Sequence, residues 1–183
     1  MGNNKKICPA ERAGYLDNIF RKWGHNPKKI LGNYIKEGMA VLDIGCGPGF
    51  FTLEMAEMVG ESGRVIAADL QADMLEKVRN KIKGREQAKR IILHKTTEDK
   101  IGVTQEVDFV LAFYILHEVP SQENFFMELK TILRPGGKVL LAEPKFHVSR
   151  KMFTDSINKA VVFGFIPVEY PKIFFSNAVV LSK

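Results

Sequence analysis

Apolar and polar positions along the chain follow two alternating patterns. Short apolar runs predict strands covered on both faces, at residues 41–44, 64–68, 90–94, 107–112 and 138–142. Between and after them, apolar residues recur at helical spacing and predict helices at residues 50–59, 74–82, 121–133 and 149–163. Strands that alternate with helices in this way build a parallel, doubly wound sheet with right-handed crossovers. The pattern therefore predicts an α/β fold in a single domain, residues 1–183.

The two ends of the chain carry different patterns. Residues 1–35 predict two helices, the second of which starts at Asn26-Pro27, a capping residue followed by a first-turn proline. These helices are expected to cover the sheet or the site beside it. After the last helix, residues 165–171 and 173–181 predict a final pair of strands.

A glycine turn follows the first predicted strand. The strand contains an acid, Asp43, and runs directly into the alternate glycines Gly45, Gly47 and Gly49. Glycines let the backbone turn tightly and approach a ligand where any Cβ would clash. The spacing differs from the Gly-x-Gly-x-x-Gly of dinucleotide binders, and the Gly-Lys-Ser/Thr of a P-loop is missing. A strand, a glycine turn and a helix in this order indicate a nucleotide-type ligand.

A second acid stands at the tip of the next predicted strand. Asp69 follows the glycine turn by on the order of twenty residues, where an acid accepts hydrogen bonds from the two hydroxyls of a ribose. The glycine turn and Asp69 together predict an adenosine-containing ligand.

Two further stretches complete a family pattern. Residues 107–119 hold the fourth strand and a Leu-His-Glu segment, and residues 133–141 hold Leu-Arg-Pro-Gly-Gly before the fifth strand. With the glycine turn and Asp69, they make residues 38–143 resemble the class I S-adenosylmethionine-dependent methyltransferases, especially the small ones of ubiquinone and menaquinone biosynthesis. The resemblance implies S-adenosyl-L-methionine as cofactor and S-adenosyl-L-homocysteine as product.

The same resemblance implies the details of the fold. It predicts a Rossmann-like, mostly parallel seven-stranded sheet whose last two strands form an antiparallel hairpin. It divides the single domain into an N-terminal helical lid (residues 1–37), a cofactor-binding core (38–145) and a C-terminal helix and hairpin (146–183).

Cofactor contacts are also implied by the resemblance. Asp43 holds the ammonium of the methionine part, directly or through water, and the backbone carbonyl of Ala112 is a second acceptor for it. The three glycines cradle the methionine part, and Cys46 between them is a small side chain that fits under the cofactor. Asp69 takes the ribose hydroxyls, and Leu70 lies against the adenine.

The chain departs from the family pattern beside the adenine. After the third strand the family usually presents an acid for the adenine amino group, whereas residues 95–99 read Lys-Thr-Thr-Glu-Asp. Thr97 aligns with that acid, and Glu98 is the neighbouring carboxylate. The adenine contact is therefore expected at Thr97 or Glu98.

Methyl transfer from a sulfonium needs chiefly the alignment of a nucleophile, and a general base only where the acceptor starts protonated. His117 is the first candidate base because imidazole titrates near neutral pH, and a packing role beside the cofactor is equally open. Tyr114 and His147 are further candidates. The loop after the fifth strand, with Glu143, Lys145 and His147, is expected either to face the acceptor or to form a plain surface turn.

The predicted function is methyl transfer to a small-molecule acceptor by in-line displacement. No substrate domain is inserted between the fifth strand and the last helix, which favours a compact acceptor. The alternatives are an RNA or protein methyltransferase and a non-catalytic cofactor-binding subunit. Residues 113–116 differ from the Asn/Asp-Pro-Pro-Tyr/Phe of many amino-group methylases, which counts against exocyclic-amine chemistry.

Composition narrows the class of protein further. The chain has 183 residues, 45% of them hydrophobic, enough for one core. Its net charge of +6 comes from scattered basic residues with one concentration at residues 77–90, which a solvated helix face explains better than a nucleic-acid partner. Two cysteines, Cys8 and Cys46, make neither a metal site nor a disulfide framework.

The sequence predicts neither a membrane-spanning segment nor a secretory signal. The longest apolar stretches fall far short of the roughly twenty residues that span a bilayer, and the first residues lack the apolar core of a secretory signal. A cytoplasmic location without a membrane span is therefore expected, and the sequence carries no signal for an oligomeric state.

Overall fold

The structure, a computed structural model, describes residues 24–183. The elements in chain order are α2 (Pro27–Leu31), β1 (Ala40–Ile44), α3 (Phe50–Met58), β2 (Arg64–Asp69), α4 (Ala72–Ile82), the 3₁₀ helix η2 (Glu86–Arg90), β3 (Ile91–Lys95), β4 (Val107–Phe113), α5 (Gln122–Ile132), β5 (Leu133–Pro144), α6 (Arg150–Val162), β6 (Ile166–Glu169) and β7 (Ser176–Ser182). The first of the two predicted N-terminal helices lies outside the described residues.

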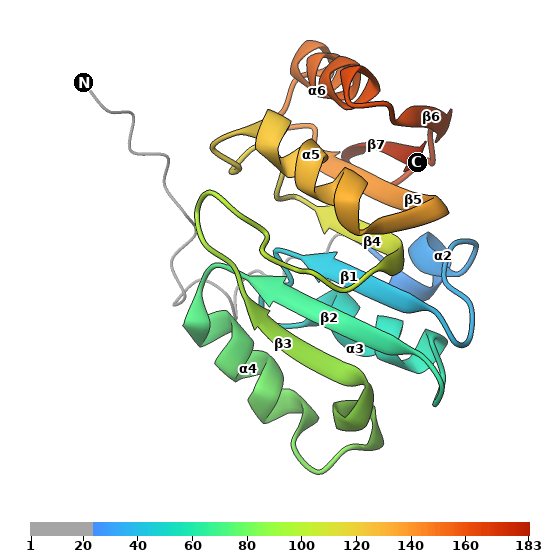
Figure 1. The fold of residues 1–183 in the computed structure, drawn as a ribbon, viewed down its shortest axis with the longest axis vertical. Coiled ribbons are helices and arrows are strands. Elements are labelled where there is room, and N and C mark those ends of the chain that lie inside the picture. Colours follow the sequence, from blue (N-terminus) through green and yellow to red (C-terminus); the bar gives the residue numbers. More distant parts are fainter. Residues whose placement is uncertain (1–23) are drawn as a thin grey trace.

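Seven strands of the described part form one sheet in the order β3-β2-β1-β4-β5-β7-β6. β1 to β5 run parallel, and β7 is antiparallel to both β5 and β6. The strand order reverses between β1 and β4, and open α/β sheets bind ligands at such a point, beyond the carboxyl ends of the strands. Figure 1 shows the arrowheads of β1, β2, β3 and β4 at one edge of the sheet. The predicted α/β fold, mostly parallel with an antiparallel C-terminal pair, is confirmed.

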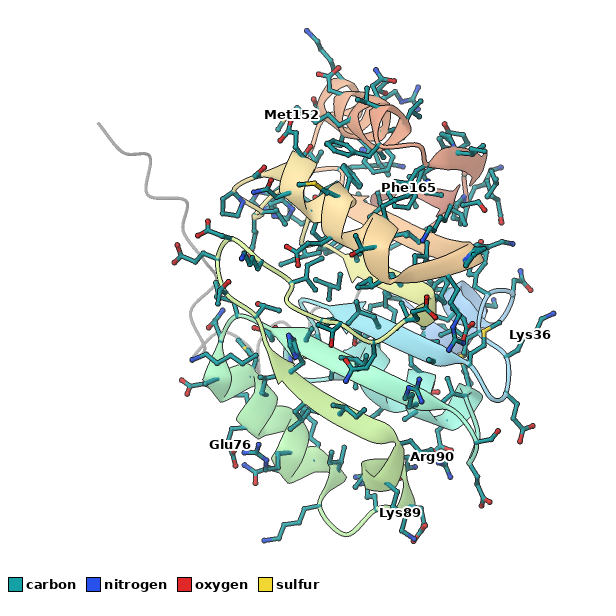
Figure 2. All side chains as sticks on the ribbon, viewed as in Figure 1. Lys36, Glu76, Lys89, Arg90, Met152 and Phe165 are labelled. Atoms are coloured by element: carbon teal, nitrogen blue, oxygen red, sulfur yellow. The ribbon has the colours of Figure 1, made fainter. Side chains whose placement is uncertain are left out.

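Helices cover both faces of this sheet. Every residue of β1 is buried: Val41 belongs to the core under α2, α3 and α4, and Leu42 to the core under α5 and α6. Figure 1 shows α5 in front of the strands and α2 and α3 behind them. On the α5 side, Phe165 (labelled in Figure 2) packs against Phe126 with ring centroids 6.0 Å apart.

Three of the described helices begin at residues whose side chains cap them. The side chains of Asn26, Ser121 and Ser149 each accept a hydrogen bond of 3.2 Å from the backbone N–H three residues on, at the starts of α2, α5 and α6. Gly164, just past α6, has a φ of 81°, a conformation that glycine adopts without strain and that ends a helix. These predicted helix ends are confirmed.

β5 begins five residues earlier than the sequence indicated. Leu133 pairs with Val107, and the next pair joins Lys138 to Phe109. Residues 134–137 are therefore looped out between two pairs of one strand. The predicted turn is present, but it is an irregularity within β5 because the chain resumes pairing with the same neighbour after it.

Other boundaries differ by smaller amounts. β7 starts at Ser176 rather than at residue 173, because Phe175 has a φ of 51°, which is incompatible with an extended strand. The 3₁₀ helix η2 was not predicted, and it delays the start of β3 to Ile91.

The basic stretch at residues 77–90 lies on α4 and η2. Arg79 pairs with Glu76 on the surface of α4, and Lys89 pairs with Glu86 at 2.8 Å. Figure 2 shows Glu76, Lys89 and Arg90 at the periphery of the molecule. Acidic neighbours within one turn are typical of the solvated helix face that the sequence predicted.

Candidate active site at the carboxyl edge of the sheet

The glycine turn lies at the carboxyl end of β1 and is tied to β2. The amides of Gly45 and Cys46 both donate to the carbonyl of Ala68, at 2.8 and 3.1 Å. The amide of Gly47 donates to Oδ2 of Asp69 at 2.9 Å. These hydrogen bonds from the neighbouring strand hold the loop in shape.

The three glycines serve two purposes, although all have a positive φ. A Cβ on Gly45 would lie 2.9 Å from the side chain of Ile115, and one on Gly49 would lie 3.0 Å from that of Val78. A Cβ on Gly47 would meet no atom of residues 24–183 within 4 Å. Packing and backbone conformation thus require Gly45 and Gly49, whereas Gly47 leaves open space above the loop.

Asp43 is buried at the end of β1. Its Oδ2 accepts a hydrogen bond of 2.6 Å from the hydroxyl of Thr52, and the two residues are 2% and 0% exposed. Burial raises the pKa of Asp43 to about 7; the Thr52 hydroxyl lowers it, and the charge of Asp69 raises it. A cationic partner stabilises the ionised form of such a buried carboxylate. Thr52 was missed by the sequence analysis, because only the folding of α3 against β1 brings it to Asp43.

Cys46 is buried within the turn. It is 5% exposed, and its Sγ contacts the carbonyl of Gly47 at 3.6 Å. Burial raises the pKa of the thiol, so Cys46 remains protonated. This agrees with its predicted character as a small, inert side chain.

Asp69 joins the tip of β2 to two backbone amides. Besides the Gly47 bond, its Oδ1 accepts from the amide of Gln71 at 2.8 Å. Burial raises the pKa of Asp69, and the hydrogen bonds from Gln71 and Gly47 oppose that rise. Each carboxylate oxygen can accept more than one hydrogen bond, so acceptor capacity remains for the ribose hydroxyls predicted there. Its role in holding the glycine turn was not predicted.

The loop after β3 lies beside Asp69. The amide of Thr96 donates to the Asp69 carbonyl at 3.0 Å. Thr97 is exposed and closes a turn, because its amide donates to the carbonyl three residues on at 3.1 Å. Glu98 is exposed and Leu70 is partly buried. The adenine contacts of Leu70 and of Thr97 or Glu98 stay predictions.

β4 ends next to the glycine turn. Ala112 pairs with Ile44, the last residue of β1. Tyr114 follows with a φ of 61°, and its hydroxyl is hydrogen-bonded to Oγ of Ser176 at 2.6 Å. Burial raises the pKa of Tyr114, which disfavours a role as a base. Tyr114 connects β4 to the start of β7, and the Ser176 contact had no signal in the sequence.

His117, Glu143 and His147 meet at the ends of β4 and β5. Oε2 of Glu143 lies 2.5 Å from Nδ1 of His117, and its Oε1 accepts from the amide of Leu116 at 2.9 Å. The ring of His147 stacks on that of His117 with centroids 5.9 Å apart and planes inclined by 8°. On the other side, Nε2 of His117 lies 4.0 Å from Oε1 of Glu118.

Glu143 was expected in the loop after the fifth strand but belongs to β5, which continues to Pro144, so the loop begins at Lys145. Glu143 is 2% exposed, so it faces inward rather than toward an acceptor or into a surface turn. Lys145 is exposed, and its amide donates to the carbonyl of Phe175 at 3.0 Å. An inward role for Glu143 was not predicted; the argument that an acid at the end of a buried strand needs a donor would have indicated it.

A cavity of about 410 Å³ lies between α2 and the segment before β7. It contains none of the predicted cofactor residues, and its lining residue His25 packs against Phe113 and Tyr114 at the end of β4. Within residues 24–183, no helix has the length and apolarity needed to cross a membrane.

The fold and the glycine turn define the architecture of class I S-adenosylmethionine-dependent methyltransferases, and comparisons with known proteins agree. Residues 35–166 match the family model described as a methyltransferase domain. The chain therefore belongs to this methyltransferase family, whose cofactor is S-adenosylmethionine.

Curated proteins with similar sequences include methyltransferases named for quinone biosynthesis. The demethylmenaquinone methyltransferase of Lactobacillus johnsonii is 34% identical over 76% of this chain and 54% of its own length. The ubiquinone/menaquinone biosynthesis C-methyltransferase of Azotobacter vinelandii is 28% identical over 82% of this chain and 58% of its own length. The chain spans about half the length of several of these curated relatives.

A similar solved structure is that of an S-adenosylmethionine-dependent methyltransferase from Aquifex aeolicus. It is 25% identical, covers 96% of this chain and 99% of its own, and superposes with a TM-score of 0.85. Fibrillarin of Aeropyrum pernix, solved with bound S-adenosylmethionine, shares the fold at 15% identity and a TM-score of 0.64 over 94% of this chain and 75% of its own.

Proposed function

We propose that this chain transfers a methyl group from S-adenosylmethionine to a small-molecule acceptor by in-line displacement. The main support for the proposal is that the predicted cofactor residues and the candidate base lie at the same edge of the sheet. The glycine turn and Asp69 lie at the ends of β1 and β2, and the His117–Glu143 pair lies at the ends of β4 and β5. Because β1 and β4 are neighbours, the two groups flank the point where the strand order reverses.

The residues present fit the cofactor at three points. The open space above Gly47 admits the methionine part. The buried carboxylate of Asp43, together with the carbonyl of Ala112, matches an ammonium group. Asp69 accepts from backbone amides, including those of Gly47 and Gln71, and its two oxygens retain acceptor capacity for a ribose diol. We therefore assign these residues to cofactor binding, with Leu70 against the adenine.

When bound, the cofactor supplies a methyl group that is already activated on a sulfonium sulfur. The protein has to hold the acceptor in line, exclude water and, for a protonated acceptor, take up a proton. As the acceptor bonds to the methyl carbon, the carbon–sulfur bond breaks and its electron pair stays on sulfur. We assign the acceptor's proton to His117, whose side chain is 26% exposed at this edge.

A quinol-type aromatic ring is the acceptor that we propose. The relatives include enzymes named for methylation of demethylmenaquinone and for C-methylation in ubiquinone and menaquinone biosynthesis. A quinol carries acidic hydroxyls, and removing one proton makes the ring system a better nucleophile, which suits a site with a base. The ring of Phe146, 56% exposed and 4.7 Å from that of His147, adds apolar surface beside the pair.

The test is methyl transfer from labelled S-adenosylmethionine by the purified full chain. The acceptors are a short-chain demethylmenaquinol, a simple phenol, a small thiol, transfer RNA and an unmodified protein mixture. We expect label in the quinol and none in the macromolecules, with Gly47→Val as the inactive control.

The alternatives give different outcomes. Label only in RNA or protein would replace the proposal with a macromolecular methyltransferase. Cofactor binding by calorimetry without label in any acceptor would favour a non-catalytic subunit.

A further inference from the structure

We propose that Glu143 is a positioning residue that sets the tautomer of His117, so that Nε2 is the basic nitrogen of the ring. The catalytic consequence rests on the proposed function, because it matters for an acceptor that must lose a proton. The tautomer itself is a property of the protein and is measurable without any acceptor.

Contacts of Glu143 dictate where the ring proton lies. The carboxylate is 2% exposed, and each of its oxygens has one close partner: the Leu116 amide at 2.9 Å and Nδ1 of His117 at 2.5 Å. An ionised carboxylate only accepts hydrogen bonds, so Nδ1 must carry a proton to bond with it. In the neutral ring the lone pair then belongs to Nε2.

The surroundings hold the ring in one orientation. Glu143 cannot turn away, because the Leu116 amide belongs to the backbone and holds the second oxygen. The His147 ring stacks on that of His117 with planes inclined by 8°. When Nε2 takes a proton, the carboxylates of Glu143 and Glu118 stand on either side of the imidazolium and stabilise it.

An amide of the same shape in place of the carboxylate keeps the packing but changes the charge and the hydrogen bonding, so it tests the tautomer separately from packing. In Glu143→Gln, the Leu116 N–H still requires an oxygen, so the amide NH₂ faces Nδ1. Two donors cannot face each other, so the ring proton is expected to move to Nε2 and the basic lone pair to Nδ1. Turnover of a protonated acceptor should then fall by about 10²–10⁴-fold, while affinity for the cofactor stays unchanged.

The direct test is nitrogen-15 NMR of the histidine rings in the full-length protein, at a pH where the rings are neutral. We expect the proton on Nδ1 of His117 in the wild type and on Nε2 in Glu143→Gln. Glu123→Gln is the matched control, since that exposed carboxylate pairs with Lys159 at 2.9 Å on the surface. It should leave both the tautomer and turnover as in the wild type.

The outcomes either support or overturn the assignment. A proton on Nε2 in the wild type, or no change of tautomer in a folded Glu143→Gln, overturns it. If Glu143→Gln fails to fold, the wild-type spectrum alone decides. A variant with the altered tautomer and full turnover overturns the catalytic part.

A double variant separates positioning from an independent role. If Glu143 acts only through His117, then Glu143→Gln combined with His117→Ala should turn over at the rate of His117→Ala alone. Losses that multiply would contradict the proposal. If no acceptor is methylated by the wild type, the proposed function fails while the tautomer measurement still stands.

Discussion

The carboxylate of Asp69 bonds the amide of Gly47 at 2.9 Å, across 22 positions of the sequence. The end of β2 thereby holds the loop that follows β1. The same Asp69 is the acceptor that we propose for the ribose hydroxyls, so the proposed contacts to the nucleoside and to the methionine part of the cofactor depend on one carboxylate.

Replacement of Asp69 by alanine should weaken cofactor binding. The variant loses the acceptor for two hydroxyls and also the bond that holds Gly47, and the loss should reach about 2–4 kcal/mol of binding free energy. Calorimetry with S-adenosylhomocysteine measures it. Asp73→Ala, an exposed acid in the first turn of α4, is the control and should bind as the wild type does. Unchanged affinity in Asp69→Ala would remove Asp69 from the ribose site.

Substitution of Gly47 by valine should abolish binding in a folded protein. Gly47 and Gly84 both have a positive φ, and a Cβ at either would meet no atom of residues 24–183 within 4 Å, so valine meets similar backbone strain at both positions. That strain costs about 1–2 kcal/mol of stability. Only the Gly47 side chain would occupy the space assigned to the cofactor. Calorimetry together with circular dichroism checks this, and equal binding by Gly47→Val and Gly84→Val would refute the assigned location.

Asp43 should make stability depend on pH. Its pKa is about 7 in the folded protein, against about 4 in an unfolded chain, so the folded state binds the proton more tightly. The contribution of Asp43 to the free energy of unfolding is therefore complete below pH about 4 and is lost as the pH rises to about 7. Asp43→Asn lacks this dependence. Urea unfolding at several pH values should show the variant gaining stability relative to the wild type over that window, and parallel curves would contradict the raised pKa.

His117 should matter only for an acceptor that starts protonated. With a quinol, His117→Ala should lower turnover by about 10²–10⁴-fold, the range for a lost general base, and should remove the acidic limb of the pH profile. With a thiolate acceptor, turnover should fall only a few-fold. His147→Ala, which removes the stacked ring but leaves the Glu143 contact, should have the smaller effect. Full activity of His117→Ala with the quinol would exclude His117 as the base.

Local sequence signals were sufficient for most of the elements. Asn26, Ser121 and Ser149 marked helix starts because a capping side chain satisfies backbone amides within its own first turn. The predicted start of β5 was wrong, because the pairing of Leu133 with Val107 depends on a strand that is distant in the sequence.

The sequence by itself determined the fold class and the nucleotide-type loop, because an apolar run, a glycine turn and an acid at a strand tip are each read from a few consecutive residues. Only the tertiary structure decided which side chains meet. Thr52 reaches Asp43, and Glu143 reaches His117 across 26 positions, because packing and strand register bring them together. Such contacts depend on the placement of whole strands and helices, and no local pattern of residues encodes that placement.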